Sequence, residues 1–256
     1  MCTAFIHKGK HLICGFNLDI NEGAMDYRVY AEPERFYIGV SAMEPPKDAA
    51  LPSHFRLDGG VRKIQGVNRD GLFAVCLNNM NFPKAPFRLA EEALPIDQLM
   101  DDCLSGRLSV DNALRAVQEK ELVNLPTGAV EIPSLAFHGF ITDPESPILL
   151  VEPGNGYAVL DGPCAAMTNY ALLELPTDLT PETYSYYGKD RLDTATAILR
   201  QRDSRFTPED GLAILQNTKQ TGTWATRVSF VYHSGENAVY YCLQGDFEHV
   251  IRHTFG

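Results

Sequence analysis

The sequence predicts an α+β fold in which two antiparallel sheets are stacked between layers of helices. Blocks of strand-like segments alternate with blocks of helical spacing, which gives the order β, α, β, α, β-hairpin along the chain. The strand-like segments are so apolar that each sheet needs cover on one face, and the helices can supply it. No internal repeat, low-complexity segment or linker divides the 256 residues, so we predict one domain over residues 1–256.

The first block of strands is predicted to be a β-meander. Residues 3–6 and 12–16 are β-prone and flank Lys8-Gly9-Lys10, which predicts an opening hairpin. Three more strands are predicted at residues 36–40, 61–67 and 72–77, with a loop over 43–52 and turns at 58–60 and 68–71. The strand at 72–77 is almost continuously apolar, which is typical of a buried strand.

The middle of the chain predicts two helices, followed by a second block of strands. Apolar residues at 96, 99, 100 and 103 share one helix face, and Gly106 ends that helix. Ser109 can cap the next helix, whose apolar residues are 113, 114, 116 and 117. Strands are then predicted at residues 135–141, 148–151, 156–160 and 164–168.

Two further helices and a hairpin are predicted in the last third of the chain. Apolar residues at 192, 195, 198 and 199 mark the first of these helices. Thr207-Pro208-Glu209-Asp210 is a strong start for the second, because it supplies a hydroxyl cap, a proline in the first turn and acidic side chains beside it. Strands at 227–232 and 238–243 flank the turn Ser234-Gly235-Glu236-Asn237.

The composition argues against several classes of protein. The net charge of −11, without a cluster of Lys and Arg, argues against nucleic acid or an anionic membrane as a partner. No run approaches 18 apolar residues, and the first residues lack the pattern of a signal peptide. The six cysteines are scattered without a CxxC pair, which argues against a metal site and favours buried thiols in a cytoplasmic protein. We expect no cofactor.

Cys2 stands directly behind the initiator methionine, at a position that is usually exposed and unimportant. Small second residues are compatible with removal of Met1, which would leave Cys2 with both a thiol and a free α-amine. An α-amine titrates near pH 7.7–8.0, so it can take the thiol proton and return it to a leaving amine. Such a site also needs a partner for the amine and donors for a tetrahedral oxyanion.

Four other residues lie at turns or strand ends where they can complete such a site. Asp19 ends the return strand of the first hairpin, and its carboxylate can accept hydrogen bonds from an α-ammonium group. Asn78 and Asn169 follow predicted strands, and their amides can donate to an oxyanion without titrating. Arg191 stands at a predicted helix start and can supply a positive charge.

The residues that carry this chemistry resemble one known family. The start MCT, the segment Gly15-Phe16-Asn17-Leu18-Asp19, a GL…LN strand, a TN pair and a later arginine at a helix start are similar to the choloylglycine hydrolases. That family includes the conjugated bile acid hydrolases and the penicillin V acylases. Its members are N-terminal-nucleophile (Ntn) hydrolases of linear amides with an αββα sandwich fold.

The resemblance assigns a role to each candidate residue. It implies that Cys2 is the nucleophile and that Asp19 holds its α-amine. Asn169 would donate to the oxyanion through its side chain and Asn78 through its backbone N–H, with Arg191 near the nucleophile. The chain departs from the family at Phe16, where an arginine is usual; loss of that cation should raise the pKa of the thiol.

The implied function is cofactor-independent hydrolysis of a small N-acyl amide through a thioester on Cys2. We expect a substrate with an apolar acyl or ring portion, and the resemblance implies a homo-oligomer, as a tetramer. Two alternatives stay open: transfer of the acyl group to an amine, and a ligand-binding homologue with reduced catalysis.

Plainer interpretations of the same residues also stay open. Cys2 can simply begin a strand, Asp19 and the asparagines can be ordinary turn residues, and Arg191 can be a surface charge. Asn79 competes with Asn78 for the same role. His138 or His233 could instead form a dyad with an internal cysteine.

Overall fold

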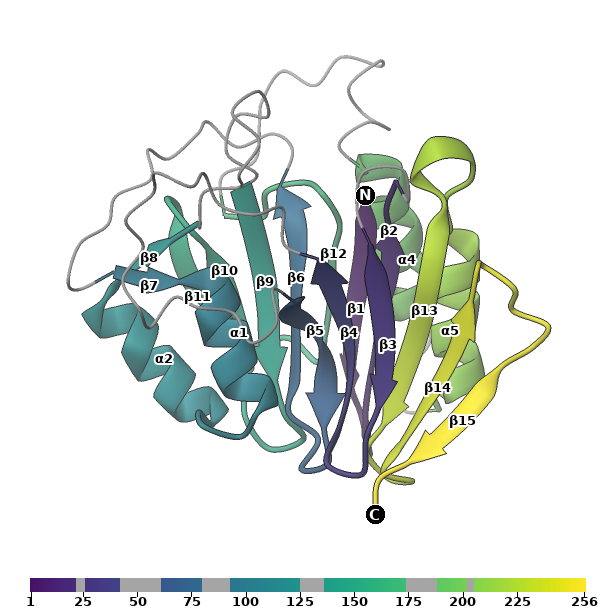
Figure 1. Ribbon diagram of the computed structural model, residues 1–256, viewed down its shortest axis with the longest axis horizontal. Coiled ribbons are helices and arrows are strands. Elements are labelled where there is room, and N and C mark those ends of the chain that lie inside the picture. Colours follow the sequence, from purple (N-terminus) through teal and green to yellow (C-terminus); the bar gives the residue numbers. More distant parts are fainter. Residues whose placement is uncertain (22–25, 42–60, 80–92, 125–135, 174–187, 202–204) are drawn as a thin grey trace.

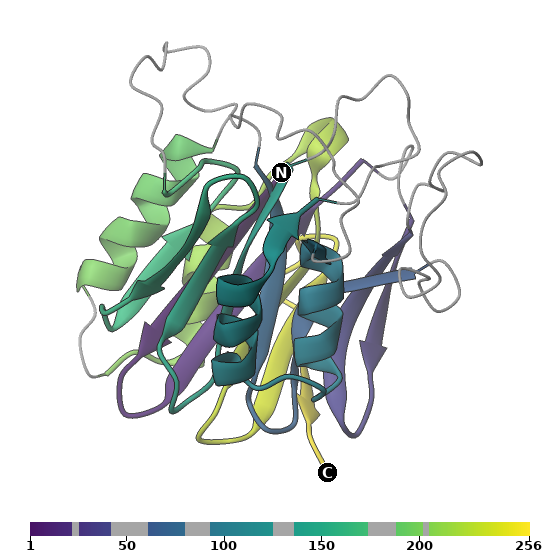
Figure 2. The same ribbon diagram turned by 90° about the vertical axis from the view of Figure 1, so that its left-hand side faces the viewer.

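The computed structural model describes residues 1–21, 26–41, 61–79, 93–124, 136–173, 188–201 and 205–256. Two antiparallel sheets are stacked face to face, and helices cover both outer sides (Figures 1 and 2). This arrangement is the predicted αββα sandwich of the α+β class. The predicted loop over 43–52 and the turn at 58–60 lie outside the described residues.

The six-stranded sheet carries the N-terminus and has the order β12-β1-β2-β13-β14-β15. Its strands are β1 Cys2–Lys8, β2 Leu12–Asp19, β12 Cys164–Met167, β13 Thr226–His233, β14 Ala238–Leu243 and β15 Ile251–Thr254. The predicted opening hairpin is present, with Cys2 opposite Leu18. Each pair of neighbouring strands is antiparallel, so the start of β1 lies beside the end of β2 and the end of β12.

The seven-stranded sheet has the order β11-β10-β9-β6-β5-β4-β3. Its strands are β3 Tyr27–Ala31, β4 Arg35–Ser41, β5 Val61–Asn68, β6 Phe73–Asn79, β9 Ala136–Thr142, β10 Ile148–Glu152 and β11 Gly156–Leu160. β6 is apolar and almost wholly buried, as predicted, and it pairs with β9 through Asn79 opposite Ala136. A short parallel pair, β7 Ala93–Pro95 and β8 Glu121–Val123, lies outside both sheets.

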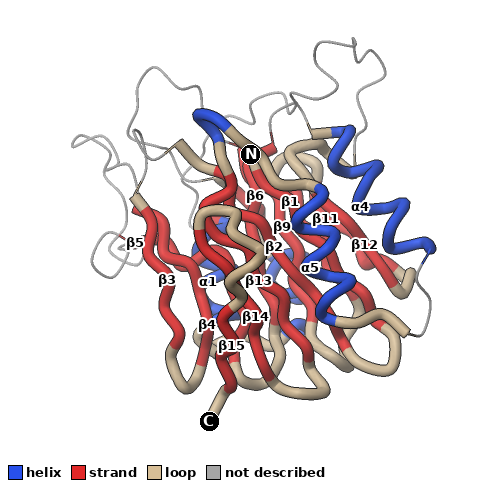
Figure 3. The backbone as a smooth tube through the Cα atoms, turned by 90° about the vertical axis from the view of Figure 1, so that its right-hand side faces the viewer, coloured by secondary structure: helices blue, strands red, loops and turns tan. Residues whose placement is uncertain are grey.

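Helices cover the outer face of each sheet. α1 (Ile96–Leu104) packs on β5, β6 and β9, and α2 (Val110–Glu119) packs beside α1. On the other side, α4 (Lys189–Gln201) and α5 (Pro208–Asn217) cover the six-stranded sheet (Figure 3). α5 begins with the predicted capping box between Thr207 and Asp210, and Ser109 caps α2.

Three hydrophobic cores separate the four layers. The largest lies between the sheets and includes the buried rings of Phe16, Phe36, Phe73, Phe140 and Phe230. Smaller cores lie between α1, α2 and the seven-stranded sheet, and between α4, α5 and the six-stranded sheet. Burial of this apolar surface is the main force that holds the layers together.

The sequence analysis did not predict β3, β7, β8 or β15. β7 and β8 have only three residues each, and β3 and β15 are edge strands whose residues are mostly exposed or half-buried, so none of them carries a strong pattern of burial. None of the helices in the described part of the chain has the length and apolar character needed to cross a membrane. All six cysteines are free, and five of them are buried.

Candidate active site

The candidate site lies where several chain segments meet at one end of the sheets. β1 starts at Cys2, β2 ends at Asp19 and β6 ends one residue after Asn78. Asn169 follows β12 by two residues, and Arg191 lies in the first turn of α4. The antiparallel registers place these ends together, so the structure gathers all five residues that the sequence singled out.

Cys2 is 7% exposed and its side chain belongs to the face of β1 that looks toward the other sheet. Its neighbours on that face are apolar, and they include Ala4 on β1 and Phe16 and Leu18 on β2. The thiol is therefore placed at the edge of the inter-sheet core, and an acyl group that reaches it meets an apolar environment.

Asn169 is fully buried and links three segments through its side-chain amide. Its Oδ1 accepts the backbone N–H of Cys2 at 2.7 Å and a guanidinium N–H of Arg191 at 3.1 Å. Its Nδ2 donates to the backbone oxygen of Asn78 at 2.5 Å. An amide nitrogen carries two hydrogens, so this contact leaves one hydrogen of Nδ2 available to another acceptor.

Arg191 holds the start of β1 from the other side. Its Nη1 donates to the backbone oxygen of Cys2 at 2.5 Å and to the hydroxyl of Thr3 at 3.2 Å. Arg191 is 3% exposed, and these contacts, together with its bond to Asn169, supply the partners that a buried cation needs. Gly188 makes this possible, because it adopts φ +80° and a Cβ there would collide with the guanidinium.

Asp19 is almost completely buried and incompletely paired. Its Oδ1 accepts the hydroxyl of Thr226 at 2.6 Å, whereas its Oδ2 has no hydrogen-bond partner and lies 3.9 Å from Nη1 of Arg191. The α-ammonium of Met1 donates to the backbone oxygen of Asp19 at 2.6 Å, and not to its carboxylate. Burial raises the pKa of Asp19 to about 7, although that α-ammonium, Thr226 and Arg191 each act to lower it.

The pKa of the Cys2 thiol also lies above its usual range. Burial raises this pKa, and the α-ammonium of Met1 is the largest influence in the opposite direction. Arg191 lowers the pKa as well, while the charge of Asp19 raises it. The thiolate at Cys2 therefore depends on a positive charge at the amino end of the chain.

Phe16 occupies the position where the similar family usually has an arginine. Its ring is fully buried in the inter-sheet core, and its centroid lies 6.0 Å from that of Phe230. No charge can be held at this position without breaking that core, and among the described side chains Arg191 supplies the positive charge that contacts Cys2.

The two asparagines at the end of β6 face opposite ways. Residues 73, 75 and 77 point into the inter-sheet core, and residues 74 and 76 point toward α1 and α2. By this alternation Asn79 shares the inter-sheet face with Cys2, whereas Asn78 contributes its backbone oxygen to Asn169. Asn79 is buried, and its Oδ1 has no hydrogen-bond partner.

The internal dyads considered from the sequence are not formed. The ring nitrogens of His138 face Glu152 Oε1 at 3.0 Å and the backbone oxygen of Thr168 at 2.6 Å, so neither is directed at a thiol. His233 lies against Glu236 and the ring of His11.

The sequence analysis gave Thr226, Thr168 and Glu152 no role at this site, and it considered His138 only for a dyad with an internal cysteine. Thr226 was hidden because it becomes a neighbour of Asp19 only through the pairing of β13 with β2. Thr168 was visible as part of the TN pair, but its hydroxyl bond to the backbone oxygen of Gly188 at 2.8 Å needs the fold.

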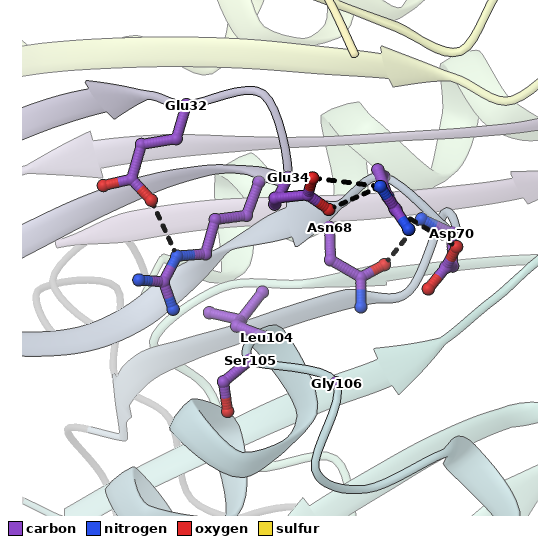
Figure 4. A pocket seen from close by; sticks show the side chains of 9 residues that line it. Glu32, Glu34, Asn68, Asp70, Leu104, Ser105 and Gly106 are labelled. Carbon is purple, nitrogen blue, oxygen red and sulfur yellow. Dashed lines mark hydrogen bonds and ion pairs between the residues drawn. The ribbon is translucent and has the colours of Figure 1, made fainter. Parts of the chain in front are cut away.

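A hollow lies at the opposite end of the sheets, and Cys2 does not line it. It has a volume of about 400 Å³, and Glu32, Glu34, Asn68, Asp70, Leu104, Ser105 and Gly106 line it with Arg35 and Arg69 (Figure 4). The charges there are paired with one another: Arg35 with Glu32 at 2.9 Å and Arg69 with Glu34 at 2.7 Å. This paired arrangement gives no sign of a bound group, and we place no site there.

The chain matches no protein-family model and no curated protein sequence. Its fold, however, is similar to that of solved structures. The C2A mutant of the conjugated bile acid hydrolase from Clostridium perfringens superposes with a TM-score of 0.61 at 14% identity, covering 98% of this chain and 92% of that one. An arginine-to-leucine variant of the same enzyme gives 0.58, also at 14% identity, with the same coverage.

Penicillin V acylase from Agrobacterium tumefaciens gives a TM-score of 0.56 at 14% identity, covering 94% of this chain and 83% of that one. The resemblance in sequence motifs thus agrees with a likeness in fold along most of the chain. The chain has the fold that the choloylglycine hydrolase resemblance implied.

Proposed function

We propose that this chain is a hydrolase of linear amides in which Cys2, after loss of Met1, is the nucleophile. The observation that carries the proposal is the convergence on Cys2 of three buried polar side chains. Asn169 and Arg191 bind its backbone N–H and oxygen, and the Asp19 carboxylate lies beside them with one oxygen unpaired. Burying an incompletely paired polar group costs folding free energy. Proteins tolerate such a cost mainly at functional sites.

Removal of Met1 would supply the missing partner of Asp19. The main-chain nitrogen of Cys2 would then carry hydrogens beyond the one that Asn169 Oδ1 accepts. The backbone oxygen of Asp19, which now accepts the Met1 α-ammonium, and its unpaired Oδ2 are the acceptors available nearby. The new α-amine would act as the base for the thiol, as its pKa near 7.7–8.0 allows.

The proposed reaction has two covalent steps. In the first, the α-amine takes the thiol proton, Sγ bonds to the substrate carbonyl carbon, and the C–N bond breaks as that proton passes to the leaving amine. In the second, water attacks the thioester and gives a proton to the α-amine, and the S–C bond breaks as that proton passes to Sγ, which releases the carboxylic acid and restores the thiol. Asn169 Nδ2 and the backbone N–H of Asn78 would stabilise the oxyanion in both steps.

The chemistry of the substrate follows from the face on which Cys2 lies. Phe16, Leu18 and the neighbouring inter-sheet residues are apolar, so we propose an N-acyl amide with an apolar acyl or ring portion. Transfer of the acyl group to an amine is a close variant, since the amine would replace water in the second step.

The experiment joins two mass measurements. Intact mass of the purified chain shows whether Met1 has been removed, and incubation with a panel of N-acyl amides tests for an acyl adduct on Cys2. The proposal expects the Met1-free form alone to gain the acyl mass and to release the amine. Release of amine by the Met1-bearing form, or an adduct on another cysteine, would rule the proposal out.

A second candidate function has its own observation. Phe16 stands in place of a cation, and burial raises the pKa of the Cys2 thiol, which together favour a slow or inactive thiol. A ligand-binding homologue would bind N-acyl amides without acylation. Tight binding by the Met1-free form without any acyl-enzyme would favour this function over hydrolysis.

A further inference from the structure

The buried pair of His138 and Glu152 lies beside the candidate site but plays no part in the proposed covalent steps. His138 is on β9 and Glu152 ends β10, and the two side chains are 0% and 1% exposed. A histidine and a carboxylate are placed together in a protein interior only where specific bonds satisfy them. Their bonds lead to one segment, the chain immediately before and after Asn169.

His138 holds the residue before Asn169. Its Nε2 lies 2.6 Å from the backbone oxygen of Thr168, and its Nδ1 lies 3.0 Å from Oε1 of Glu152. A carbonyl oxygen can only accept, so Nε2 carries a hydrogen. Because the hydrogen bond from His138 is the main influence that overcomes burial, the pKa of Glu152 lies below its usual value, and Glu152 is an acceptor too.

Both ring nitrogens of His138 are therefore held by oxygen atoms of neighbouring strands and loops. Within the described part of the chain, Glu152 is the ionisable side chain that forms an ion pair with it. Hydrogen bonds to a carboxylate such as that of Glu152 have fixed directions and are stronger than bonds between neutral groups.

Glu152 holds the residues after Asn169. Its Oε1 accepts the backbone N–H of Leu172 at 2.7 Å, and its Oε2 accepts that of Leu173 at 3.1 Å. The pair thus fixes the main chain on both sides of Asn169. Thr168 extends the same arrangement toward Arg191, because its hydroxyl donates to the backbone oxygen of Gly188 just before α4.

We infer that His138 and Glu152 are positioning residues, which clamp the chain around Asn169 so that its Nδ2 stays aimed at the substrate oxyanion. The inference rests on the proposed function and adds a pair of residues to it. Asn169 is the residue whose orientation matters most, since one amide must serve Cys2, Arg191 and Asn78 at once. A displacement near 1 Å of such a donor can cost about 100-fold in rate.

The test compares two reactions of Cys2. Amide turnover forms an oxyanion, whereas alkylation by iodoacetamide displaces iodide at a saturated carbon and forms none. In H138Q and E152Q we expect kcat for amide turnover to fall about 10- to 100-fold, and the alkylation rate to fall at least tenfold less than kcat does. H7Q is the matched control, because His7 is a buried histidine of β1 stacked on Phe206; it should keep both rates.

A double-mutant cycle with N169A separates positioning from general stability. If His138 acts through Asn169, H138Q should change kcat by less than about twofold once Asn169 has been removed. Full additivity of the two losses, or alkylation that falls in parallel with turnover, would overturn the inference.

One further measurement covers the case in which H138Q or E152Q does not fold. Nitrogen NMR of the wild-type chain should show a hydrogen on Nε2 of His138, and a bare Nε2 would contradict its bond to the backbone oxygen of Thr168. Absence of turnover in the Met1-free wild type would refute the proposed function, whereas turnover that H138Q and E152Q leave unchanged would refute this inference alone.

Discussion

The two ends of the sandwich place arginines and carboxylates together in opposite ways. At the far hollow, Arg69 is half exposed and pairs directly with Glu34, so each charge is satisfied by the other and by water. At the Cys2 end, Arg191 is buried and gives its bonds to main-chain and amide oxygens, while the nearest oxygen of Asp19 stays 3.9 Å away without a hydrogen-bond partner. An incomplete set of buried charges, and not the hollow with its paired charges, marks the end at which we propose the site.

The strongest test of this contrast removes the thiol. C2A should lower amide turnover by at least about 10⁴-fold and abolish the acyl-enzyme, because no other group at the site can form a thioester. Turnover is measured by amine release and the adduct by intact mass. C164A is the control, since Cys164 is a half-buried thiol on β12 away from the converging groups; a comparable loss in C164A would break the contrast.

Removal of the Asn169 amide should have the next largest effect. N169A should lower kcat about 10²- to 10³-fold, as expected for one oxyanion donor, with a smaller change in KM. Steady-state kinetics measure both constants. The control N112A, at an exposed position of α2, should match the wild type. An N169A variant with wild-type kcat would show that Asn169 plays no part in the reaction.

Replacing an arginine by lysine at each end of the sandwich, in R191K here and in R69K below, sharpens the comparison. R191K should cost about 2 kcal/mol of unfolding free energy and lower turnover about tenfold, because an ammonium group cannot reach Cys2, Thr3 and Asn169 together. Urea denaturation gives the free energy. Equal stability of R191K and the wild type would mean that the buried guanidinium contacts contribute little.

Asp19 should make the stability of the Met1-bearing chain depend on pH. Its folded pKa of about 7 lies above the ordinary value of 3.8, so the folded state holds the proton more tightly than the unfolded state. Its contribution is therefore present below pH 4 and is lost as pH rises through about 7. D19N should remove this dependence and raise Tm relative to the wild type by about 2–4 °C more at pH 8 than at pH 4.

Thermal scans of both chains across this range, with Met1 retained by inhibition of methionine aminopeptidase, make the measurement. A wild-type chain whose Tm rises from pH 4 to pH 7 relative to D19N would have the opposite sign and would show that the carboxylate is satisfied.

The smallest effect is expected at the far hollow. R69K should change the unfolding free energy by less than about 0.5 kcal/mol and leave turnover unchanged, because an exposed ion pair contributes little. Urea denaturation of R69K and R191K side by side completes the comparison. A loss of turnover in R69K would mean that the two ends of the sheets are coupled.

Much of this arrangement could be predicted from the sequence, and there are physical reasons why the rest could not. Strands such as β6 and helices such as α5 were predictable because burial and capping leave local patterns. The edge strands β3 and β15 were not, since exposed residues carry no such pattern. Asp19 and Asn169 were found from motifs. Thr226, however, which donates to Asp19, is 207 residues away from it in sequence, and His138 is 30 residues away from Thr168, the residue before Asn169 that it bonds. Only the pairing of strands brings these residues near the site.

The position of Met1 has a practical consequence for anyone who makes this protein. The α-ammonium of Met1 donates to the backbone oxygen of Asp19. The C-terminus lies at the opposite end of the sandwich, where the backbone N–H of Gly256 donates to the backbone oxygen of Pro33 (Figure 1). In the proposed mechanism the free α-amine of Cys2 is the base, and a purification tag fused ahead of Met1 would permanently block it. A tag added after Gly256 leaves that end untouched, so the choice of vector alone would decide whether an assay finds a catalyst or an inert chain.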